Sequence, residues 1–565
     1  MPYRITILAN KSNPYGISKD VEGLLKVFEN TDYNVKVCDP LEVPEYSDLC
    51  IHLEIPVYVW MPWSAKNFFV VNPEWYMDAW EPYMSKFDKI IVKDSSVLSK
   101  FANWPATLIE WAHAPLPPFP EPSKDEFLWV IGASINKRAY VSALLPLWKP
   151  SYPMLTITSV VALEGLTLPP NVQVLVKEFN NLDARLNYFG QFKGHICCSR
   201  AEGFGYTAAE AETMGAFTIM NSLGPYLQMY KNDYRVAFLP SRLEGVFDLG
   251  ASLGSLEEAL DLAIEAFESY TLNDCLSRRE KHAYRWMNFN DTWLDLVKDS
   301  FCPDSTVKVL PPILEPADCP NISVVTLIYN RKKFFDLACH NIIISDYPKD
   351  KIEWILVDDS DDPAQQNSDE IMRAVKSSGP LKMVYVPLAK KTPVSQKRNL
   401  GIMRATAPIV LMMDDDDHYP ETSFRRRVAW LTKHPWAPKA VSATNIACYD
   451  LVTAVSAVNS PPLGLALAQR ISEATLTFYK SWWEEKGFPS DVVIGEGEGF
   501  LSGREQDVLE IPPQQIIVAF SHGKNVSSRR VPSGADVTPG CFWGFPKEFL
   551  EFLHGLAGIK VVETT

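Results

Sequence analysis

The chain has 565 residues, more than one hydrophobic core usually supports, so we expect two to four domains. Its hydrophobic content of 47% and charged content of 22% are ordinary for a soluble globular protein. The formal net charge of −15 argues against a general nucleic-acid-binding protein, which would need a basic surface. No apolar run reaches the roughly 18 residues of a membrane-spanning helix.

The ten cysteines are scattered through apolar segments, and none forms a C-x-x-C pair. This usage is typical of a reducing compartment and indicates neither a disulfide framework nor a zinc site. Residues 1–8 enter an expected strand directly and lack the basic and apolar regions of a signal peptide. We therefore expect a soluble, cytoplasmic protein without a transmembrane segment.

Residues 1–122 are predicted to form a first Rossmann-type domain. Short apolar runs alternate there with helical or loop segments, which is typical of a parallel, doubly wound sheet. A proline-rich stretch at 115–122 is expected to be a stiff connector. The expected strands are 4–9, 33–38, 49–53, 68–71 and 89–92.

A second Rossmann-type domain is predicted at 123–303, a proline-rich linker at 304–320 and a third α/β domain at 321–565. The expected strands of the second domain are 127–131, 155–158, 172–176 and 194–198. Those of the third domain are 322–328, 354–357, 382–386, 407–413 and 515–519.

Four consecutive aspartates, Asp414 to Asp417, follow the apolar run 407–413. Such a run is typical of a buried strand, and ligands of an open α/β sheet bind beyond the carboxyl ends of its strands. Two carboxylates about 4 Å apart repel by roughly 4 kcal/mol at an effective dielectric near 20. A divalent ion such as Mg²⁺ or Mn²⁺ relieves this repulsion and usually also holds substrate phosphates. The alternative, a solvated acidic turn or helix cap, is disfavoured by the preceding strand.

Three further motifs accompany the aspartates. Thr-x-x-Tyr-Asn ends the first expected strand at 326–330, Val-Asp-Asp-Ser ends the second at 357–360, and Arg-Asn-x-Gly begins a helix at 398–401. Together with the Asp-x-Asp motif, these elements resemble the nucleotide-sugar-dependent glycosyltransferases of GT-A fold, family 2. The resemblance covers about residues 320 to 530.

The resemblance implies a nucleotide pocket made by the ends of the first two strands. Tyr329 and Asp359 would hold the nucleobase, by stacking and by accepting a hydrogen bond from a ring N–H. Thr326 and Arg331 would flank the nucleotide.

The aspartates, together with Lys397 and Arg398, would bind the rest of the donor. Asp414 would reach the ribose and share a divalent ion with Asp416, and Asp415 would contribute to donor binding. The ion offsets the charge on the leaving diphosphate. Lys397 and Arg398 are the nearest cations for the phosphates, and the alternative is that they are surface charges on a helix.

Inverting transfer also needs a carboxylate that removes the acceptor hydroxyl's proton. Glu496 and Glu498 occupy the place of the family's Glu-Asp motif, but no Asp follows the first Glu, so both remain candidates. Counting back from Phe500 favours Glu496, and the alternative is a flexible acidic loop. His522, after the expected strand 515–519, is a candidate third metal ligand or a surface histidine.

The N-terminal half carries a second set of candidates. Glycines follow a buried strand at 199–215 and precede a helix, so backbone N–H groups can face a phosphate. This stretch resembles the Glu-x7-Glu region of retaining glycosyltransferases of GT-B fold, family 4. The resemblance places Glu202 near the donor sugar as a catalytic residue and Glu210 on the ribose. Thr207-x-x-Glu210 also fits a helix capping box.

In the same fold, Lys137 and Arg138 would neutralise the diphosphate in place of a metal. The sequence thus indicates a bifunctional glycosyltransferase, in which a GT-B-like pair of Rossmann-type domains precedes a GT-A nucleotide-diphospho-sugar transferase domain. Its expected partners are nucleotide-sugar donors and a glycan or glycoconjugate acceptor. The alternative is a single active GT-A domain with a non-catalytic GT-B-like module that binds acceptor or partner.

Two other classes fit less well. A nucleotidyltransferase typically has a glycine-rich phosphate loop after its first strand, and residues 326–330 are not one. A glycan-binding module would not need both a metal motif and a nucleotide pocket.

Overall fold

The computed structural model describes most of the chain. The described residues are 2–10, 16–117, 119–163, 165–177, 179, 181–300, 312–366, 368–377, 379–490, 492, 495–522, 525, 531–532, 537, 540 and 543–559. Among them, no helix combines the length and the apolar character that crossing a membrane requires.

The first sheet is parallel throughout and has the order β2-β1-β3-β4-β5-β6. Its central strand β3 is buried along its whole length, including the polar residues Ser47, Asp48 and His52. Helix α1 (Gly16–Phe28) covers one face. The strands are β1 (Arg4–Leu8), β2 (Asn34–Cys38), β3 (Ser47–Leu53), β4 (Ser64–Val70), β5 (Lys89–Val92) and β6 (Ala106–Leu108), and the 3-10 helices are η1 (Tyr58–Trp63), η2 (Asp78–Lys86) and η3 (Ser95–Phe101).

The second sheet is also parallel, with the order β12-β11-β10-β7-β8-β9. Its strands are β7 (Lys124–Gly132), β8 (Leu155–Ser159), β9 (Val172–Val176), β10 (Phe192–Ile196), β11 (Phe217–Asn221) and β12 (Val236–Leu239). Its helices are α2 (Ile135–Leu144), α3 (Leu182–Phe189), α4 (Tyr206–Met214), α5 (Gly224–Tyr230) and α6 (Leu253–Glu268), and a hairpin joins β13 (Leu243–Glu244) to β14 (Phe247–Asp248).

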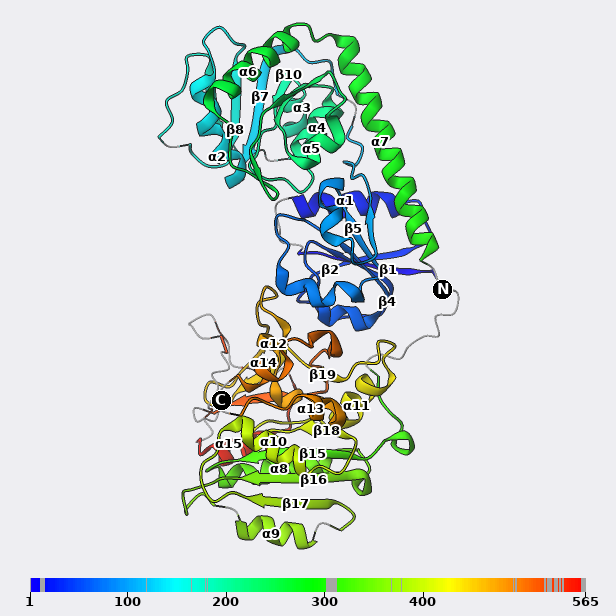
Figure 1. Ribbon diagram of the computed structural model, residues 1–565, viewed down its shortest axis with the longest axis vertical. Coiled ribbons are helices and arrows are strands. Elements are labelled where there is room, and N and C mark those ends of the chain that lie inside the picture. Colours follow the sequence, from blue (N-terminus) through cyan, green and yellow to red (C-terminus); the bar gives the residue numbers. More distant parts are fainter. Residues whose placement is uncertain are drawn as a thin grey trace.

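A long helix, α7 (Leu272–Asp299), runs from the second sheet to the first (Figure 1). Its first turn is fixed by a capping box between Thr271 and Asp274. Near its other end, Phe289, Trp293 and Val297 are buried in the core of the first sheet. The helix therefore packs against both the first and the second sheet.

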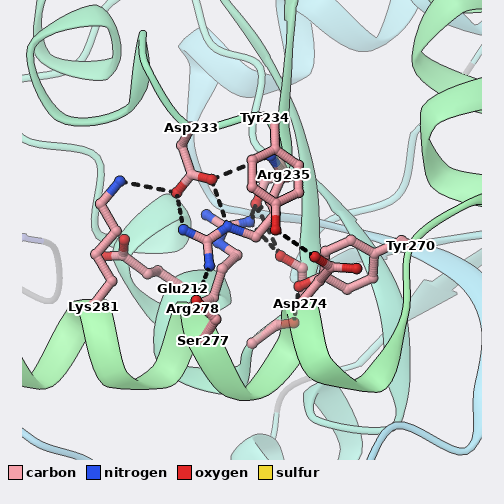
Figure 2. A network of polar contacts seen from close by, with 12 residues as sticks. Glu212, Asp233, Tyr234, Arg235, Tyr270, Asp274, Ser277, Arg278 and Lys281 are labelled. Carbon is pink, nitrogen blue, oxygen red and sulfur yellow. Dashed lines mark hydrogen bonds and ion pairs between the residues drawn. The ribbon is translucent and has the colours of Figure 1, made fainter.

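Figure 2 shows polar contacts between the first half of α7 and residues 233–235, which lead into β12. Asp233 accepts hydrogen bonds from Arg235 Nε at 2.6 Å and from Lys281 at 3.1 Å. Arg235 also donates to Ser277 at 2.7 Å. The fully buried Arg278 donates to the carbonyl of Ala216. The carboxylate of Asp233 accepts from two of these cations, and a backbone carbonyl accepts from Arg278. These hydrogen bonds lower the free-energy cost of burying the charges between helix and sheet.

The third sheet is mixed, with the order β17-β16-β15-β18-β22-β19-β23. Its parallel part, β17 to β18, is followed by the antiparallel strand β22. The strands are β15 (Ile322–Ile328), β16 (Ile352–Asp358), β17 (Lys382–Pro387), β18 (Ile409–Met412), β19 (Ala440–Ser442), β22 (Thr477–Tyr479) and β23 (Val508–Glu510).

A smaller sheet of order β21-β20-β24 lies beside it: β20 (Ile446–Asp450), β21 (Val455–Asn459) and β24 (Val518–Ser521). The helices of this region are α8 (Phe335–Ile344), α9 (Ser368–Ser377), α10 (Val394–Arg404), α11 (Ser423–Lys433), α12 (Leu467–Arg470), α13 (Lys480–Glu485), α14 (Glu496–Leu501) and α15 (Lys547–Ala557).

The first and third sheets share one apolar core. Trp80 and Tyr83 of η2 belong to the same buried cluster as Leu467 of α12 and Trp482 of α13. Trp80 Nε1 also donates to the carbonyl of Leu463 at 2.9 Å. We call each of the three large sheets, together with its helices, the first, second and third unit. The first unit is therefore packed between the second unit and the third, as Figure 1 shows.

The prediction of a mixed α/β chain with parallel sheets is confirmed, but local details differ. The strand expected at 515–519 begins only at Val518, because Gln515 has a left-handed backbone with φ of 61°. The capping box at Thr207 does not form, because Gly205, at φ 91°, is the N-cap of α4. Of the predicted linker, residues 304–311 lie outside the described residues.

Candidate functional site

The carboxyl ends of three neighbouring strands form the candidate site of the third unit. β15 pairs with β16 and with β18, all parallel, so Tyr329, Asp359 and Asp414 follow strands that end at one edge of the sheet. This edge is where ligands of α/β sheets bind.

Carboxylate oxygens of Asp414, Asp416 and Asp417 lie within 4.8 Å of one another, close enough to share a metal ion. Asp417 is buried, and its Oδ1 accepts a hydrogen bond from the backbone of Phe520 at 3.1 Å, so it also fixes β24. Oxygen donors of this kind suit Mg²⁺ or Mn²⁺.

Arg331 lies against the aspartates in this structure. Its Nη2 is 3.0 Å from Oδ1 of Asp415, and its Nη1 donates to Asp416. Burial raises the pKa of Asp415 to about 7, with Asp416 and Asp414 adding to the effect and Arg331 opposing it. The guanidinium thus supplies part of the positive charge that the run requires.

His522 lies beside the same run. Its Nε2 is 3.2 Å from Oδ2 of Asp416, and its ring packs on Phe334 at 4.6 Å between centroids. Within the described part of the chain, its buried Nδ1 has no hydrogen-bond partner. The histidine is not on the surface, and its imidazole lies next to Asp416 as a candidate further donor beside the three clustered aspartates.

The predicted nucleobase pocket contains a buried ion pair. Lys397 donates to Asp359 and, at 2.8 Å, to the carbonyl of Ile328, while Asp359 also accepts from the backbone of Thr392 at 2.9 Å. Burial lowers the pKa of Lys397, although Asp359 opposes the shift. The idea that Lys397 is a surface charge is therefore wrong.

Tyr329, by contrast, is partly exposed, and Lys391 lies 4.3 Å from its ring centroid. Thr326 has no exposed surface and accepts a hydrogen bond from Trp354 Nε1 at 3.0 Å. It therefore lies beneath the pocket.

Arg398 is also buried, and it pairs with one of the two candidate bases. Its Nε lies 2.8 Å from Oε1 of Glu496. Burial alone would lower the pKa of Arg398, but Glu496, Asp414 and Glu473 raise it. Glu498 is exposed and accepts from Gln469 at 3.1 Å.

Glu473, in the 3-10 helix η8 (Glu473–Thr475), was not predicted from the sequence. Its Oε1 accepts from the backbone N–H of Gly497 at 3.2 Å. No motif surrounds it, and only the fold brings η8 beside α14. Trp482, which precedes α14 in the chain, is a core residue.

A second polar cluster lies between the first and second sheets. Glu210 of α4 pairs with Lys19 of α1 and, at 3.0 Å, with Arg185 of α3. His113 Nε2 is 3.8 Å from the same carboxylate. Burial would raise the pKa of Glu210, but Lys19, His113 and Arg185 hold it well below the usual range.

Glu202 lies near this cluster, 3.7 Å from Lys137 Nζ, which also donates to Thr207 at 3.2 Å. Arg138 donates to the carbonyl of Ala133 at 3.4 Å. On the opposite side, burial and Glu202 raise the pKa of Glu74 to about 7. Glu210 and Glu202 thus face groups of the first unit, Lys137 pairs with Glu202, and Arg138 is bound to its own loop.

Residues 323–446 match the family model described as glycosyl transferase family 2. With the fold and the aspartate cluster, this match defines the class of the third unit: it is a glycosyltransferase domain. A comparison with curated proteins found no match.

Among solved structures, the chain is similar to mannosyltransferase PcManGT from Pyrobaculum calidifontis in complex with GDP-Man and Mn²⁺. The identity is 19% over 38% of this chain and 60% of that one, with a TM-score of 0.28. It is also similar to S. aureus TarS, at 16% identity over 36% and 37% of the chains and a TM-score of 0.27. For TarS 1-349 in complex with UDP-GlcNAc, the identity is 17% over 37% of this chain and 62% of that one, with a TM-score of 0.28. The chain spans only about 60% of the first of these proteins, and similarity at this level assigns neither substrate nor mechanism.

Proposed function

We propose that the third unit, residues 321–565, transfers a sugar with inversion from a nucleoside-diphosphate donor to a glycan or glycoconjugate. The main supporting observation is that Asp414 and Asp416 follow β18, beside the strands that lead to Tyr329 and Asp359, and that His522 lies next to Asp416. Carboxylates and an imidazole beside a candidate nucleobase pocket support a metal-dependent donor site.

Asp414, Asp416 and His522 would hold Mn²⁺ or Mg²⁺, which when bound offsets charge on the leaving diphosphate. Tyr329 would stack on the nucleobase, and Asp359, oriented by Lys397, would accept from it. Arg331 would then face the phosphates, and Asp415, with which it pairs, would contribute to donor binding. Glu496 or Glu498 is the base that the sequence proposes.

We further propose that the N-terminal half is a GT-B-like unit that transfers a second sugar with retention and without metal. Glu202 would lie near the donor sugar, Glu210 would bind the ribose, and Lys137 and Arg138 would neutralise the diphosphate. The support is that Glu202, Glu210 and Lys137 lie at the interface between two parallel sheets. We keep the predicted boundaries at 122, 303 and 320 for these units.

A second candidate has a specific observation in its favour. Glu210 already pairs with Lys19 of the first unit, so this ion pair helps to hold the two sheets together, while Lys137 pairs with Glu202 within the second unit. On this hypothesis the N-terminal half binds acceptor or partner without chemistry. We also propose a cytoplasmic location, supported by the free state of all eight described cysteines.

The test combines donor binding with donor hydrolysis. Sugar nucleotides of uridine, guanosine and cytidine are screened by thermal shift and hydrolysis, with Mn²⁺ or with EDTA. Metal-dependent hydrolysis that Asp416→Ala abolishes supports the third-unit site, with Asp350→Ala at an exposed position as the control. Metal-independent hydrolysis that Glu202→Gln abolishes supports a second catalytic site. If no sugar nucleotide binds or is hydrolysed, the proposed function is wrong.

A further inference from the structure

The base of the proposed inverting reaction can be sought in the space around Gly497. This glycine stands where the family's Glu-Asp motif has its Asp, so the side chain expected there is missing. A Cβ atom built on Gly497 would lie 2.5 Å from Oε1 of Glu473 and 2.9 Å from its Cγ. The carboxylate of Glu473 therefore occupies the space that a side chain at 497 would need.

The two glutamates flanking Gly497 are engaged elsewhere. Glu496 is buried and bound to Arg398, so its carboxylate already has a partner within the fold. Glu498 is exposed on α14 and accepts a hydrogen bond from Gln469. Glu473, in contrast, is partly exposed, and Gly497 N–H donates to only one of its oxygens.

Glu473 is also joined to the aspartate run by a short path. The hydroxyl of Tyr419 accepts from the backbone N–H of Asp414 at 2.8 Å. The same hydroxyl donates to the carbonyl of Ala474 at 3.1 Å. The residue next to Glu473 is therefore fixed to the residue that begins the metal cluster, and Glu473 belongs to the same edge of the sheet.

We propose that Glu473, and not Glu496 or Glu498, is the catalytic base of the third unit. Glu473 takes the proton of the acceptor hydroxyl, whose oxygen bonds to the anomeric carbon of the donor sugar. The bond from that carbon to the diphosphate oxygen breaks, and the nucleoside diphosphate leaves with the electron pair. The assignment rests on the proposed function.

The protonation properties of Glu473 agree with this role. Burial raises its pKa, Glu496 adds to the effect, and Arg398 opposes it. A carboxylate whose pKa lies nearer to the working pH is a better proton acceptor.

The test uses Glu473→Gln in the full-length protein with a donor found in the screen above. Glutamine keeps an oxygen that can accept from Gly497 N–H but cannot take a proton. We expect kcat to fall by roughly 100-fold or more, since general base catalysis contributes about 10² to 10⁴. The donor Kd should stay within about twofold, and the acidic limb of the pH–kcat/KM profile should disappear. Glu484→Gln, exposed on α13, is the matched control and should match wild type.

A second variant pair tests the geometry by moving the carboxylate back to α14. Glu473→Ala opens the space beside Gly497, and Gly497→Asp then places a carboxylate in it. The remaining neighbour, Cδ1 of Ile471 at 2.8 Å from the built Cβ, is the end of a flexible side chain. We expect the double variant to be at least about tenfold more active than Glu473→Ala alone.

The outcomes separate the base assignment from the proposed function. If wild type neither binds nor hydrolyses any sugar nucleotide, the proposed function fails. If wild type is active and Glu473→Gln stays within about threefold of it, only the base assignment fails. If the double variant binds donor but is as inactive as Glu473→Ala, Glu473 positions Gly497 instead of transferring the proton, and the proposal is overturned.

Discussion

Replacing Glu74 by Gln should make the N-terminal half more stable at alkaline pH. Oε2 of Glu74 is buried with no hydrogen-bond partner among the described residues, and it lies 3.0 Å from the position of a Cβ on Gly203. Burial and the facing Glu202 raise the pKa of Glu74 from its usual 4.5 to about 7. The ionised carboxylate is therefore poorly accommodated in the folded state.

The direction in which stability changes with pH follows from proton linkage. Between pH 4.5 and about 7 the folded state binds this proton more tightly than the unfolded state, so the contribution of Glu74 to stability is lost as the pH rises. The loss between pH 5 and pH 8 amounts to about 2.5 kcal/mol at most. Glutamine is neutral at both pH values and avoids it.

The assay is urea unfolding of wild type and Glu74→Gln at pH 5 and pH 8, followed through the transition of the N-terminal half. The gain in unfolding free energy from the substitution should be about 1 to 2.5 kcal/mol larger at pH 8 than at pH 5. Glu81→Gln, at an exposed position in η2, is the control and should show no such difference. A difference below about 0.5 kcal/mol for Glu74→Gln would refute the reasoning.

Three further outcomes are expected. Lys397→Met leaves Asp359 buried without its cation and should lower the free energy of urea unfolding by about 3 to 5 kcal/mol. Adding Asp359→Asn should recover part of this loss. If the losses of the two substitutions are additive, the pairing is contradicted. Trp293→Ala removes a fully buried ring that joins α7 to the first sheet and should cost about 3 to 5 kcal/mol, whereas a loss below about 1 kcal/mol would show that α7 is not part of that core. Mn²⁺ with a nucleoside diphosphate at 100 times Kd should stabilise the protein by about 2.7 kcal/mol in thermal unfolding; EDTA or Asp416→Asn should remove this gain, and its persistence would place the metal elsewhere.

The sheets could be predicted because their strands are short apolar runs between polar turns. β3 and β16 are buried along their whole lengths, and each contains an apolar run that is visible in the sequence, at 49–51 and 354–357. The start of β24 could not be predicted in this way, because the apolar run 516–520 begins inside a turn whose left-handed residue, Gln515, is not a glycine that would mark it.

The candidate site was predictable only where its residues follow strands of the parallel sheet. Asp359 and Asp416 follow β16 and β18, so strand order alone brings them to one edge. Glu473 lies in a short 3-10 helix before an antiparallel strand, and its contact with Gly497 depends on how η8 packs on α14. Packing of this kind leaves no periodic signal in the sequence.

The path of α7 gives the N-terminal half a nested construction. The chain leaves the first sheet at Trp111 and returns to its core at Phe289, and the two rings are only 4.9 Å apart between centroids. The second sheet is thus an insert whose two ends meet, the arrangement that best tolerates exchange of an inserted domain. A version of the protein in which a short loop replaces residues between these two points should keep the shared core of the first and third sheets. The second sheet is then an inserted domain that can be deleted or exchanged without disturbing the glycosyltransferase domain.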